Sequence, residues 1–289
     1  MTKILKGKDV VDKLNGELLK RTDVLRQNGI IPTLALLRVG NRQDDLAYER
    51  GAEKRAEKTG ISTMKVVLPE NITTEELVCE IEKLNEDEYV HGILIFRPLP
   101  KHIDDEAVRD ALNPEKDVDG ITYISQAGVF TGTDIGYAPC TAEACIELLD
   151  FFDIDLQGKN ITIVGRSDVI GKPVSMMMLK KNATVTICHT KTVELDRICR
   201  ESDIIVTAAG CPGILSKNCF SENQVVVDVA INFTPDNVMT GDVNFEDVRG
   251  VVGAVTPVPG GIGIVTTSIL MKHCVEAAEK ISREVLKQQ

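Results

Sequence analysis

Residues 165–173 read GRSDVIGKP and directly follow the apolar run NITIV. A glycine at the end of a strand lets the chain turn sharply, and the backbone N–H groups of the following helix start can then face a phosphate. The spacing from Gly165 to Gly171 is G-x-S-x-x-x-G, which differs from the usual G-x-G-x-x-G. Taken alone, the pattern is about equally typical of a plain strand–helix turn, so its neighbours decide how it is interpreted.

The strand that follows ends in ICHTKT and carries no acidic residue. In NAD-binding folds an Asp or Glu about 20 residues after the glycines holds the ribose 2′-hydroxyl. Here the strand end offers His189, Thr190 and Lys191 instead, and Arg166 lies in the preceding turn. Donors without a carboxylate suit a 2′-phosphate, so the sequence favours NADP over NAD as the cofactor. The alternative is that Arg166 and Lys191 are only solvated charges.

The segment 44–60, DDLAYERGAEKRAEKTG, is crowded with charges of both signs, as expected of a solvent-facing helix. Tyr48 is its one large aromatic residue, and the small residues Gly51 and Ala52 follow one helical turn later. A pair of aspartates directly before a helical run is a common N-terminal signal, so we expect Asp45 to cap this helix.

Strand-like and helix-like patterns alternate along the chain and must position these residues. In the first half we expect strands at 31–40, 62–69 and 90–96 and helices at 8–28, 45–59, 73–87 and 104–114. In the second half we expect strands at 158–165, 183–189, 203–210 and 225–231 and helices at 171–182, 192–202 and 264–288. This order predicts a two-domain α/β protein with parallel sheets, whose second half is a doubly wound domain of Rossmann type.

The segment between these halves is predicted from its composition. Residues 116–139 are rich in Gly, Asp and Thr, so we interpret them as a loop. Residues 141–153 then form a helix with Thr141 as its cap, which carries the chain into the second domain.

Length and composition limit the class of protein. A chain of 289 residues predicts two domains, and a net charge of −11 argues against a nucleic-acid partner or an anionic membrane surface. The N-terminus has no signal or transit pattern and no long uncharged apolar run exists, so we expect a cytoplasmic protein. The eight cysteines lack any C-x-x-C pair and the four histidines lack metal-ligand spacing, which predicts reduced thiols and no metal site.

Several longer segments match the methylenetetrahydrofolate dehydrogenase/cyclohydrolase family in order and spacing, and the chain resembles this family over essentially its whole length. In the second half the segments are VGRSDVIGKP, ATVTICHTKT, DIIVTAAGCPG, VVVDVAIN, GDVNFEDV and TPVPGGIG. In the first half they are VGNRQDDLAYERGAEKRAEKTGI, HGILIFRPLPKHID, NPEKDVDGI and APCTAEACIELL.

The resemblance implies a fold, a cofactor and two reactions. It implies a homodimer of two-domain subunits, with NADP on the Rossmann-type domain and the tetrahydrofolate substrate in the cleft between the domains. We accordingly expect residues 1–140 and 270–289 to form the folate-binding catalytic domain and residues 141–269 the NADP-binding domain. The reactions are oxidation of 5,10-methylenetetrahydrofolate to the 5,10-methenyl cation and hydrolysis of that cation to 10-formyltetrahydrofolate.

The resemblance also assigns roles to individual residues. Two residues are expected to be catalytic: Tyr48, which stacks on the folate, and Asp119, which holds the pterin. The expected cofactor-binding residues are Gly165, Arg166, Ser167, Thr190 (in place of the family serine that binds the 2′-phosphate) and Ile231. The expected substrate-binding residues are Tyr48, Ala52, Phe96, Arg97, Asp119, Pro259, Gly260, Gly261, Ile262 and Gly263.

The chain departs from the family pattern on the substrate side. The family lysine four residues after the tyrosine is Ala52 here, the glutamine that partners this lysine is Phe96, and the following leucine is Arg97. Arg55 lies on the face of Tyr48 but about 5 Å beyond the lysine position, one helical turn on. Arg97 neighbours the glutamine position, but successive strand residues face opposite sides of a sheet. Neither arginine is therefore a clean replacement for the lysine.

The two reactions place different demands on these residues. Hydride transfer is driven by the lone pair of the folate nitrogen and mainly needs alignment of donor and acceptor, whereas hydrolysis needs an activated water and proton transfer. We therefore expect a monofunctional, or nearly monofunctional, NADP-dependent dehydrogenase, with a separate cyclohydrolase completing the conversion.

Three alternatives stay open. Both activities could survive, with water or Arg55 filling the gap left by the lysine. The chain could be a non-catalytic protein that binds folate or NADP, although the intact GRS motif, Tyr48 and Asp119 argue against this. It could also be a dehydrogenase that has moved to another substrate, which Phe96 and Arg97 leave open.

Overall fold

The computed structural model describes residues 2–288, with side chains described for residues 2–281. The chain divides into two compact units. Unit 1 comprises Met1–Asp12 and Thr141–Thr266, and unit 2 comprises Lys13–Cys140 and Thr267–Gln289.

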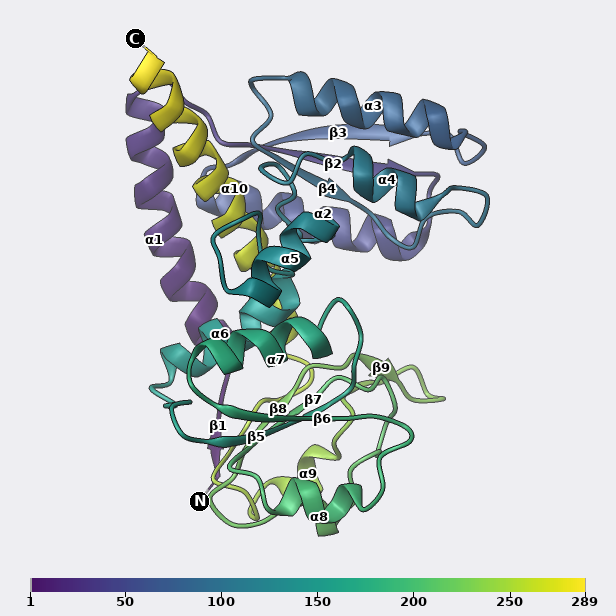
Figure 1. The fold of residues 1–289 in the computed structure, drawn as a ribbon, viewed down its shortest axis with the longest axis vertical. Coiled ribbons are helices and arrows are strands. Elements are labelled where there is room, and N and C mark those ends of the chain that lie inside the picture. Colours follow the sequence, from purple (N-terminus) through teal and green to yellow (C-terminus); the bar gives the residue numbers. More distant parts are fainter. Residues whose placement is uncertain (1, 289) are drawn as a thin grey trace. The chain divides into compact units, whose positions relative to one another are not determined.

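Unit 2 is built on a three-stranded parallel sheet in the order β3-β2-β4. Its strands are β2 (Thr33–Val39), β3 (Ser62–Leu68) and β4 (Gly92–Ile95). Its helices are α1 (Gly7–Gln27, which begins in unit 1), α2 (Gln43–Thr59), α3 (Thr74–Glu86), α4 (Asp105–Ala111) and α5 (Tyr123–Thr131). Six of the seven residues of β2 are buried, because α3 and α4 cover one face of the sheet and α2 the other (Figure 1).

Local signals account for helix α3, one of the helices that were predicted in unit 2. Helix α3 begins with a capping box, in which Glu76 N donates to Thr73 Oγ1 (3.2 Å) and Thr73 N donates to Glu76 Oε2 (2.9 Å). Its buried residues Leu77, Ile81 and Leu84 recur at helical spacing and join the apolar cluster on the sheet.

The prediction of a loop over residues 116–139 is wrong, because helix α5 lies within it. Thr122 caps this helix by accepting from Ser125 N, and Gly132 ends it with a left-handed backbone (φ +71°). Gly128 lies inside the helix. A side chain would not fit at this position, because a Cβ there would be 2.1 Å from the carbonyl oxygen of Ile135. The small and polar residues that suggested a loop are therefore the caps and the packing contact of a helix.

Unit 1 contains a six-stranded parallel sheet in the order β1-β11-β8-β7-β5-β6 and a short antiparallel pair, β9 and β10. The strands are β1 (Lys3–Ile4), β5 (Asn160–Val164), β6 (Thr184–Cys188), β7 (Ile204–Thr207), β8 (Val225–Asp228), β9 (Asn232–Phe233), β10 (Met239–Thr240) and β11 (Ala254–Val255). The helices are α6 (Cys140–Phe151), α7 (Gly171–Lys180), α8 (Leu195–Arg200), the 3-10 turn Lys217–Cys219, α9 (Phe245–Val248) and α10 (Ile262–Gln288), whose later part belongs to unit 2.

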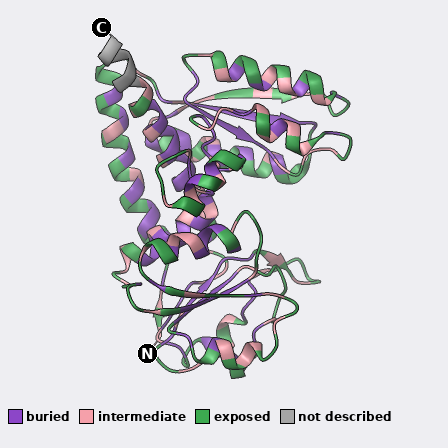
Figure 2. Ribbon diagram, viewed as in Figure 1, coloured by how far each residue is buried: buried purple, intermediate pink, exposed green. Residues whose placement is uncertain are grey.

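The sheet of unit 1 has helix α7 on one face and α8 and α9 on the other (Figure 1). Its central strands are buried, whereas the helices bury one side and expose the other (Figure 2). This is the doubly wound α/β arrangement that the sequence predicted, with the parallel strands ending at one edge of the sheet. Helix α6 begins at Cys140, so Thr141 lies inside it and the prediction that Thr141 caps it is wrong.

The N-terminal segment groups differently from the predicted division of the chain. Lys3 N donates to Gly253 O (2.8 Å) and Leu5 N to Val255 O (2.9 Å), which adds β1 to the sheet of unit 1. The C-terminal part of α10 groups with unit 2, where it lies beside α1 (Figure 1) and Arg21 Nε pairs with Glu279 Oε1 at 2.8 Å. A two-residue strand gives almost no sequence signal, which is why the first twelve residues were assigned to the other domain.

Among the residues that the structure describes, no helix has the length and apolar character needed to cross a membrane.

Candidate active site

Tyr48 lies on α2 and keeps 36% of its surface exposed. Its ring contacts Phe96 edge-on, with the ring centroids 5.8 Å apart and the planes at 82°. Desolvation raises the pKa of the Tyr48 phenol well above its ordinary value, and the charge of nearby Asp119 acts in the same direction. The structure therefore brings Tyr48, Phe96 and Asp119 together from three separate elements of unit 2.

Ala52 is fully buried, one turn after Tyr48 on α2. Phe96 is only 4% exposed and follows the end of β4, where its N–H donates to Leu37 O at 2.9 Å. The two positions where the resembled family carries a lysine and a glutamine thus hold a buried methyl group and a buried phenyl ring. Neither side chain can donate, accept or move a proton.

Arg55 was the alternative source of a positive charge on the Tyr48 face of α2. Its Nη1 atom donates to Asn15 Oδ1 on α1 at 3.4 Å. This contact directs the Arg55 side chain toward α1, in keeping with the expected offset from the lysine position.

Asp45 does not cap α2, so that prediction is wrong. The N-cap position is Arg42, which makes no side-chain cap hydrogen bond, and Asp45 lies inside the first turn. The Asp45 carboxylate is buried, and this burial raises its pKa, against the opposing effect of the Arg42 charge. The paired aspartates did mark the helix start, but the helix begins two residues earlier than the signal implied.

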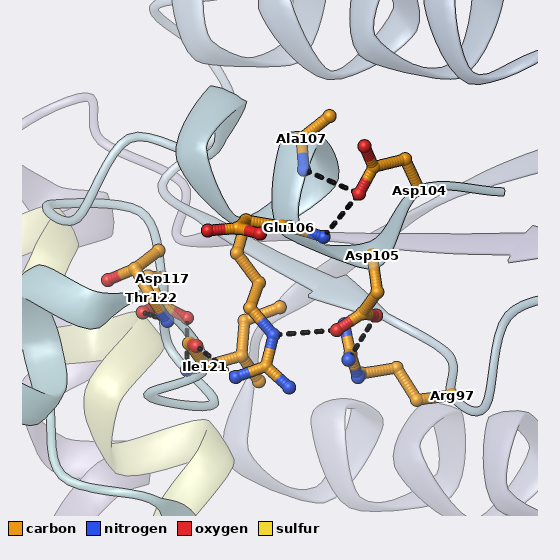
Figure 3. Close-up of polar contacts among 9 residues, drawn as sticks. Arg97, Asp104, Asp105, Glu106, Ala107, Asp117, Ile121 and Thr122 are labelled. Atoms are coloured by element: carbon orange, nitrogen blue, oxygen red, sulfur yellow. Dashed lines mark hydrogen bonds and ion pairs between the residues drawn. The ribbon is translucent and has the colours of Figure 1, made fainter.

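Arg97 lies closer to the site than strand alternation predicted. Strand β4 ends at Ile95, so the alternation of side chains along a strand no longer applies at Arg97. The guanidinium pairs with Asp105 at the start of α4 (Figure 3), and its positive charge helps to lower the pKa of Asp119. Its Nη1 atom is buried and has no hydrogen-bond partner among the residues that the structure describes.

The carboxylate of Asp105, which pairs with Arg97, also pairs with a second arginine. Asp105 also accepts from Arg109 Nε at 2.8 Å, and Arg109 Nη1 donates to Ile121 O at 3.3 Å. These two arginine contacts lower the pKa of Asp105 despite the opposing effect of burial. Figure 3 shows this chain of contacts reaching the turn in which Asp117 accepts from Ile121 N and Thr122 N. Arg97 is thereby tied to the loop that carries Asp119.

Asp119 is a carboxylic acid whose pKa departs clearly from its ordinary value. Desolvation raises its pKa to about 6, with a further increase from the neighbouring charge of Asp117. A hydrogen bond from Cys140 and the charges of His273 and Arg97 act in the opposite direction. A carboxylate with a pKa near neutrality is common at functional sites, although structural networks also produce one.

Cys140 and His273 are residues of this site that the sequence analysis missed. They are 133 residues apart in the chain; Cys140 lies in the segment APCTAEACIELL, whereas His273 lies in none of the segments that match the family. The cysteines were predicted together to be reduced thiols, and His273 was considered only as a possible metal ligand. No pattern in the sequence could have paired them, because α6 and α10 meet only in the folded chain.

In unit 1, the turn after β5 has the geometry of a tight strand–helix connection. Gly165 has φ +130°, and a Cβ there would lie 2.5 Å from Ala208 O. A Cβ on Gly171 would lie 2.3 Å from Gly165 O. Ser167 Oγ accepts from Ile170 N (3.2 Å) and Gly171 N (3.4 Å), which fixes the start of α7. Both glycines are therefore required by the turn itself.

The turn after β6 exposes the predicted donors. His189 N donates to Thr192 Oγ1 (2.8 Å) and Lys191 N to His189 Nδ1 (3.1 Å), which folds the segment into a compact turn. Thr190 and Lys191 remain exposed on it, and Arg166 is exposed in the turn after β5. This donor set, without a carboxylate at the end of β6, suits a 2′-phosphate.

The remaining residues that were expected to bind the cofactor or the substrate lie at the C-terminal side of the same sheet. Ile231 is 53% exposed after β8, and its Cδ1 atom lies 3.3 Å from where a Cβ on Gly263 would be. Gly260 has φ +100°, and a Cβ on Gly261 would lie 2.5 Å from Pro257 O. The structure thus brings Ile231 against the turn 259–263, which begins with a cis Val258–Pro259 bond and leads into α10.

Two family models match the chain. The model described as tetrahydrofolate dehydrogenase/cyclohydrolase, catalytic domain, matches residues 5–119. The model described as tetrahydrofolate dehydrogenase/cyclohydrolase, NAD(P)-binding domain, matches residues 139–282.

Known proteins resemble the chain over nearly its full length. The bifunctional protein FolD of Clostridium botulinum (strain Okra / Type B1) is 48% identical over 282 residues, which are 98% of this chain and 100% of that protein. The crystal structure of the bifunctional enzyme FolD from Campylobacter jejuni superposes with a TM-score of 0.95 at 37% identity, covering 97% of this chain and 99% of that one. The Trypanosoma brucei methylenetetrahydrofolate dehydrogenase-cyclohydrolase, solved with NADP and an inhibitor, gives 0.91 at 34% identity, covering 98% and 99%.

Proposed function

The chain belongs to the tetrahydrofolate dehydrogenase/cyclohydrolase family, and we propose on this basis that it oxidises 5,10-methylenetetrahydrofolate to the 5,10-methenyl cation with NADP, while its cyclohydrolase activity is weak or absent. The family and the printed functions of its relatives support the dehydrogenase. The proposed loss of hydrolysis is carried by one observation in this chain: the positions of the family lysine and its partner glutamine hold the buried side chains of Ala52 and Phe96.

Unit 2 supplies the groups that would hold the substrate. The exposed face of the Tyr48 ring offers a stacking surface for the flat pterin and aminobenzoate rings. An ionised Asp119 accepts hydrogen bonds from the amide and amino N–H groups of the pterin. These contacts orient the methylene bridge, which is the main contribution that a protein makes to hydride transfer.

Unit 1 fits NADP through its turns and exposed donors. Gly165 and Gly171 let the turn after β5 close without a clash, so backbone N–H groups can approach a pyrophosphate at the start of α7. Arg166, Thr190 and Lys191 would hold the 2′-phosphate. When bound, NADP accepts the hydride that leaves the methylene carbon with the electron pair of the broken C–H bond.

Hydrolysis of the methenyl cation makes a different demand on the protein. Water must lose a proton as it adds to the cationic carbon, and one positioned acid–base residue typically contributes 10²–10⁴-fold to such a step. Ala52 and Phe96 supply no such group, and Arg55 is directed toward α1. An arginine in that place would also hold its proton too tightly to act as a base. The oxidation does not depend on a group at these positions, so it is expected to persist.

The test is to measure both reactions on one purified sample. We expect NADP-dependent oxidation of 5,10-methylenetetrahydrofolate, while the methenyl product decays at the rate seen without enzyme. Enzymatic hydrolysis comparable to the oxidation rate would contradict the proposed loss, and absence of oxidation would contradict the proposed dehydrogenase.

Restoring the family residues provides the matched variant. The double substitution Ala52→Lys and Phe96→Gln should raise hydrolysis by at least about tenfold if the lysine and its partner are the missing groups. Ala52→Lys alone is the control, because without the glutamine a buried ammonium lacks a hydrogen-bond partner. No gain in the double variant would favour a substitute group already present.

The bifunctional enzyme is the second candidate function. It is favoured by the names of the relatives, since the Clostridium botulinum protein at 48% identity is called bifunctional. In that case both activities appear in the wild-type protein, with an ordered water in place of the lysine. A non-catalytic binding protein, or a dehydrogenase with another substrate, would instead show no oxidation of methylenetetrahydrofolate.

We further propose, from the sequence, a homodimer in the cytoplasm that works together with a separate cyclohydrolase. The two enzymes would share the methenyl intermediate, which the dehydrogenase releases.

A further inference from the structure

Arg97 carries a buried hydrogen-bond donor that has no partner. Its side chain is 24% exposed, and its Nη2 atom pairs with Asp105 Oδ1 at the start of α4. Its Nη1 atom is buried, without a hydrogen-bond partner in the described part of the chain. A guanidinium group keeps its proton and can only donate, so a buried and unpaired Nη1 is costly unless a ligand or an ordered water accepts from it.

The carboxylate of Asp105 leaves no further oxygen for this donor. Asp105 Oδ1 is engaged by Arg97 Nη2, and Asp105 Oδ2 accepts from Arg109 Nε at 2.8 Å. Two positive charges therefore share one negative charge. The Arg97 guanidinium is held by one of its nitrogen atoms while Nη1 stays available to an acceptor from outside the protein.

Arg97 also adjoins the proposed stacking site. It directly follows Phe96, whose N–H donates to Leu37 O at 2.9 Å and whose ring meets the Tyr48 ring edge-on, with the centroids 5.8 Å apart. Consecutive Cα atoms are about 3.8 Å apart. The Arg97 side chain therefore starts one residue away from the surface on which the folate is proposed to stack.

The same network of contacts ties Arg97 to the turn that carries Asp119. Arg109 Nη1 donates to Ile121 O at 3.3 Å, two residues after Asp119. Asp105 joins Arg109 to Arg97, and Figure 3 shows these contacts running from Arg97 to the turn. The charge of Arg97 helps to lower the pKa of Asp119, in keeping with this placement.

The substrate of the proposed function presents a matching edge. Its pterin ring carries an N–H group and an amino group, which donate, and a carbonyl group next to the N–H, which accepts. Asp119 is proposed to accept from the donors, but an ionised carboxylate cannot donate to the carbonyl. A buried arginine donor beside this carboxylate supplies the missing half of the pair.

We infer that Arg97 is a specificity-determining residue of the substrate site: Nη1 donates to the pterin carbonyl while Asp119 accepts from the neighbouring N–H group. The inference rests on the proposed function, because it takes methylenetetrahydrofolate as the substrate. The resembled family carries a leucine at this position, so the contact is particular to this chain. The role is binding and not acid–base catalysis, because a guanidinium holds its proton too tightly.

The main test compares two ligands by calorimetry, tetrahydrofolate and its 4-amino analogue, which has an amino group in place of the pterin carbonyl. The wild-type protein should prefer tetrahydrofolate, because the analogue sets a donor against Arg97. Arg97→Leu installs the family residue and removes the donor. Its Kd for tetrahydrofolate should rise roughly tenfold or more, and its preference should shrink by a similar factor. Asp119 meets the same altered ring in both proteins, so the change in preference reports on Arg97.

Matched variants separate this hydrogen bond from charge and from packing. Arg109→Leu removes the other arginine from Asp105 but leaves the Arg97 pair in place, so the preference should change by less than about threefold. Arg97→Lys keeps the positive charge on a single nitrogen, which Asp105 engages, and should restore little of the preference. Full restoration by lysine would show that charge alone is responsible and would overturn the inference.

Steady-state kinetics give a second readout. Arg97→Leu should raise KM for 5,10-methylenetetrahydrofolate roughly tenfold or more, with kcat and KM for NADP changed by less than about twofold, because the contact is the same in the substrate and the transition state. A wild-type protein that oxidises the substrate, with an unchanged preference in Arg97→Leu, would overturn the inference and assign Nη1 to an ordered water. A wild-type protein that binds neither ligand and oxidises no methylenetetrahydrofolate would reject the proposed function and the inference with it.

Discussion

At the scale of single residues, the proposed substrate site holds some of the side chains found in the family and lacks others. Tyr48 and Phe96 pack edge-on, and Asp119 lies close enough to affect the Tyr48 phenol. Ala52, one turn after Tyr48, is buried and cannot take part in proton transfer. The groups proposed to bind the substrate therefore lie together, whereas the positions proposed to activate water hold side chains that cannot move a proton.

Asp119→Asn tests the binding role of the carboxylate. Asparagine has nearly the same shape but presents one donor and loses the charge, so a hydrogen bond to a charged acceptor is lost. We expect KM for 5,10-methylenetetrahydrofolate to rise roughly thirtyfold at pH 7.5, with KM for NADP unchanged, measured by steady-state kinetics. The rise of KM below about pH 6 should also disappear, because the titrating group is gone. An acid limb that persists in the variant would assign it to another residue.

Some residues of the candidate site could be predicted from the sequence and others could not. Tyr48, Ala52 and Phe96 could be assigned because long motifs place them by number alone. Asp45 was wrongly predicted as a cap, because a helix start can shift by two residues without changing the local signal. Cys140 and His273 could not be found, since their pairing depends on how α6 and α10 pack around Val118.

At the scale of elements, the ends of the parallel strands carry the candidate cofactor residues of unit 1. The turn after β5 closes because Gly165 and Gly171 leave no Cβ in the way of neighbouring carbonyl groups. Strand and helix patterns predicted the central elements well, because β5, β7 and β8 are nearly continuous buried runs and α7 has a buried stripe. The helix α5 was missed because its caps and its packing glycine resemble the composition of a loop.

Gly165→Ala tests the turn as a structural requirement. At φ +130° and with Ala208 O only 2.5 Å from the new Cβ, alanine should force the turn open and lower stability by about 1–3 kcal/mol. KM for NADP should rise with it, while KM for the folate substrate changes little. Gly158→Ala is the control, because Gly158 also has a positive φ (+72°) but meets no atom within 4 Å. Equal effects of the two substitutions on KM for NADP would contradict a specific role for the turn.

The loops after β7 and β8 are organised by a pair of buried carboxylates. Asp228, at the end of β8, accepts from Asp242 N (3.1 Å) and Val243 N (2.9 Å). Asp242 in turn accepts from Thr207 Oγ1 (2.8 Å) and Cys211 N (2.7 Å). Desolvation, together with the charge of Asp242, raises the pKa of Asp228 to about 7.

This raised pKa predicts a component of stability that depends on pH. Between the ordinary value of 3.8 and about 7, the folded protein binds a proton that the unfolded chain has released. The unfolding free energy should therefore fall as the pH rises through this window, by up to about 1.4 kcal/mol per pH unit from this group. Asp228→Asn should remove that component, as measured by urea unfolding at pH 5, 6 and 7. A variant with the same pH slope as the wild-type protein would contradict the assignment.

At the scale of the whole molecule, two units of α/β architecture share one chain that passes between them more than once. The two family models match residues 5–119 and 139–282, so nearly the whole chain belongs to one family. The predicted fold class is confirmed, and the division of the chain differs mainly at its first twelve residues. Strand β1 joins the sheet of unit 1 through only two residues, and so short a pairing leaves no periodic pattern to detect.

The central claim for the whole molecule is that one family activity is kept and the other is lost. The most direct measurement is the ratio of methenyltetrahydrofolate hydrolysis to methylenetetrahydrofolate oxidation on one wild-type sample, corrected for hydrolysis without enzyme. We predict a ratio below about 0.01, in line with the loss of one positioned acid–base group, and a large increase in Ala52→Lys with Phe96→Gln. A wild-type ratio near one would contradict the account and establish the chain as a bifunctional enzyme.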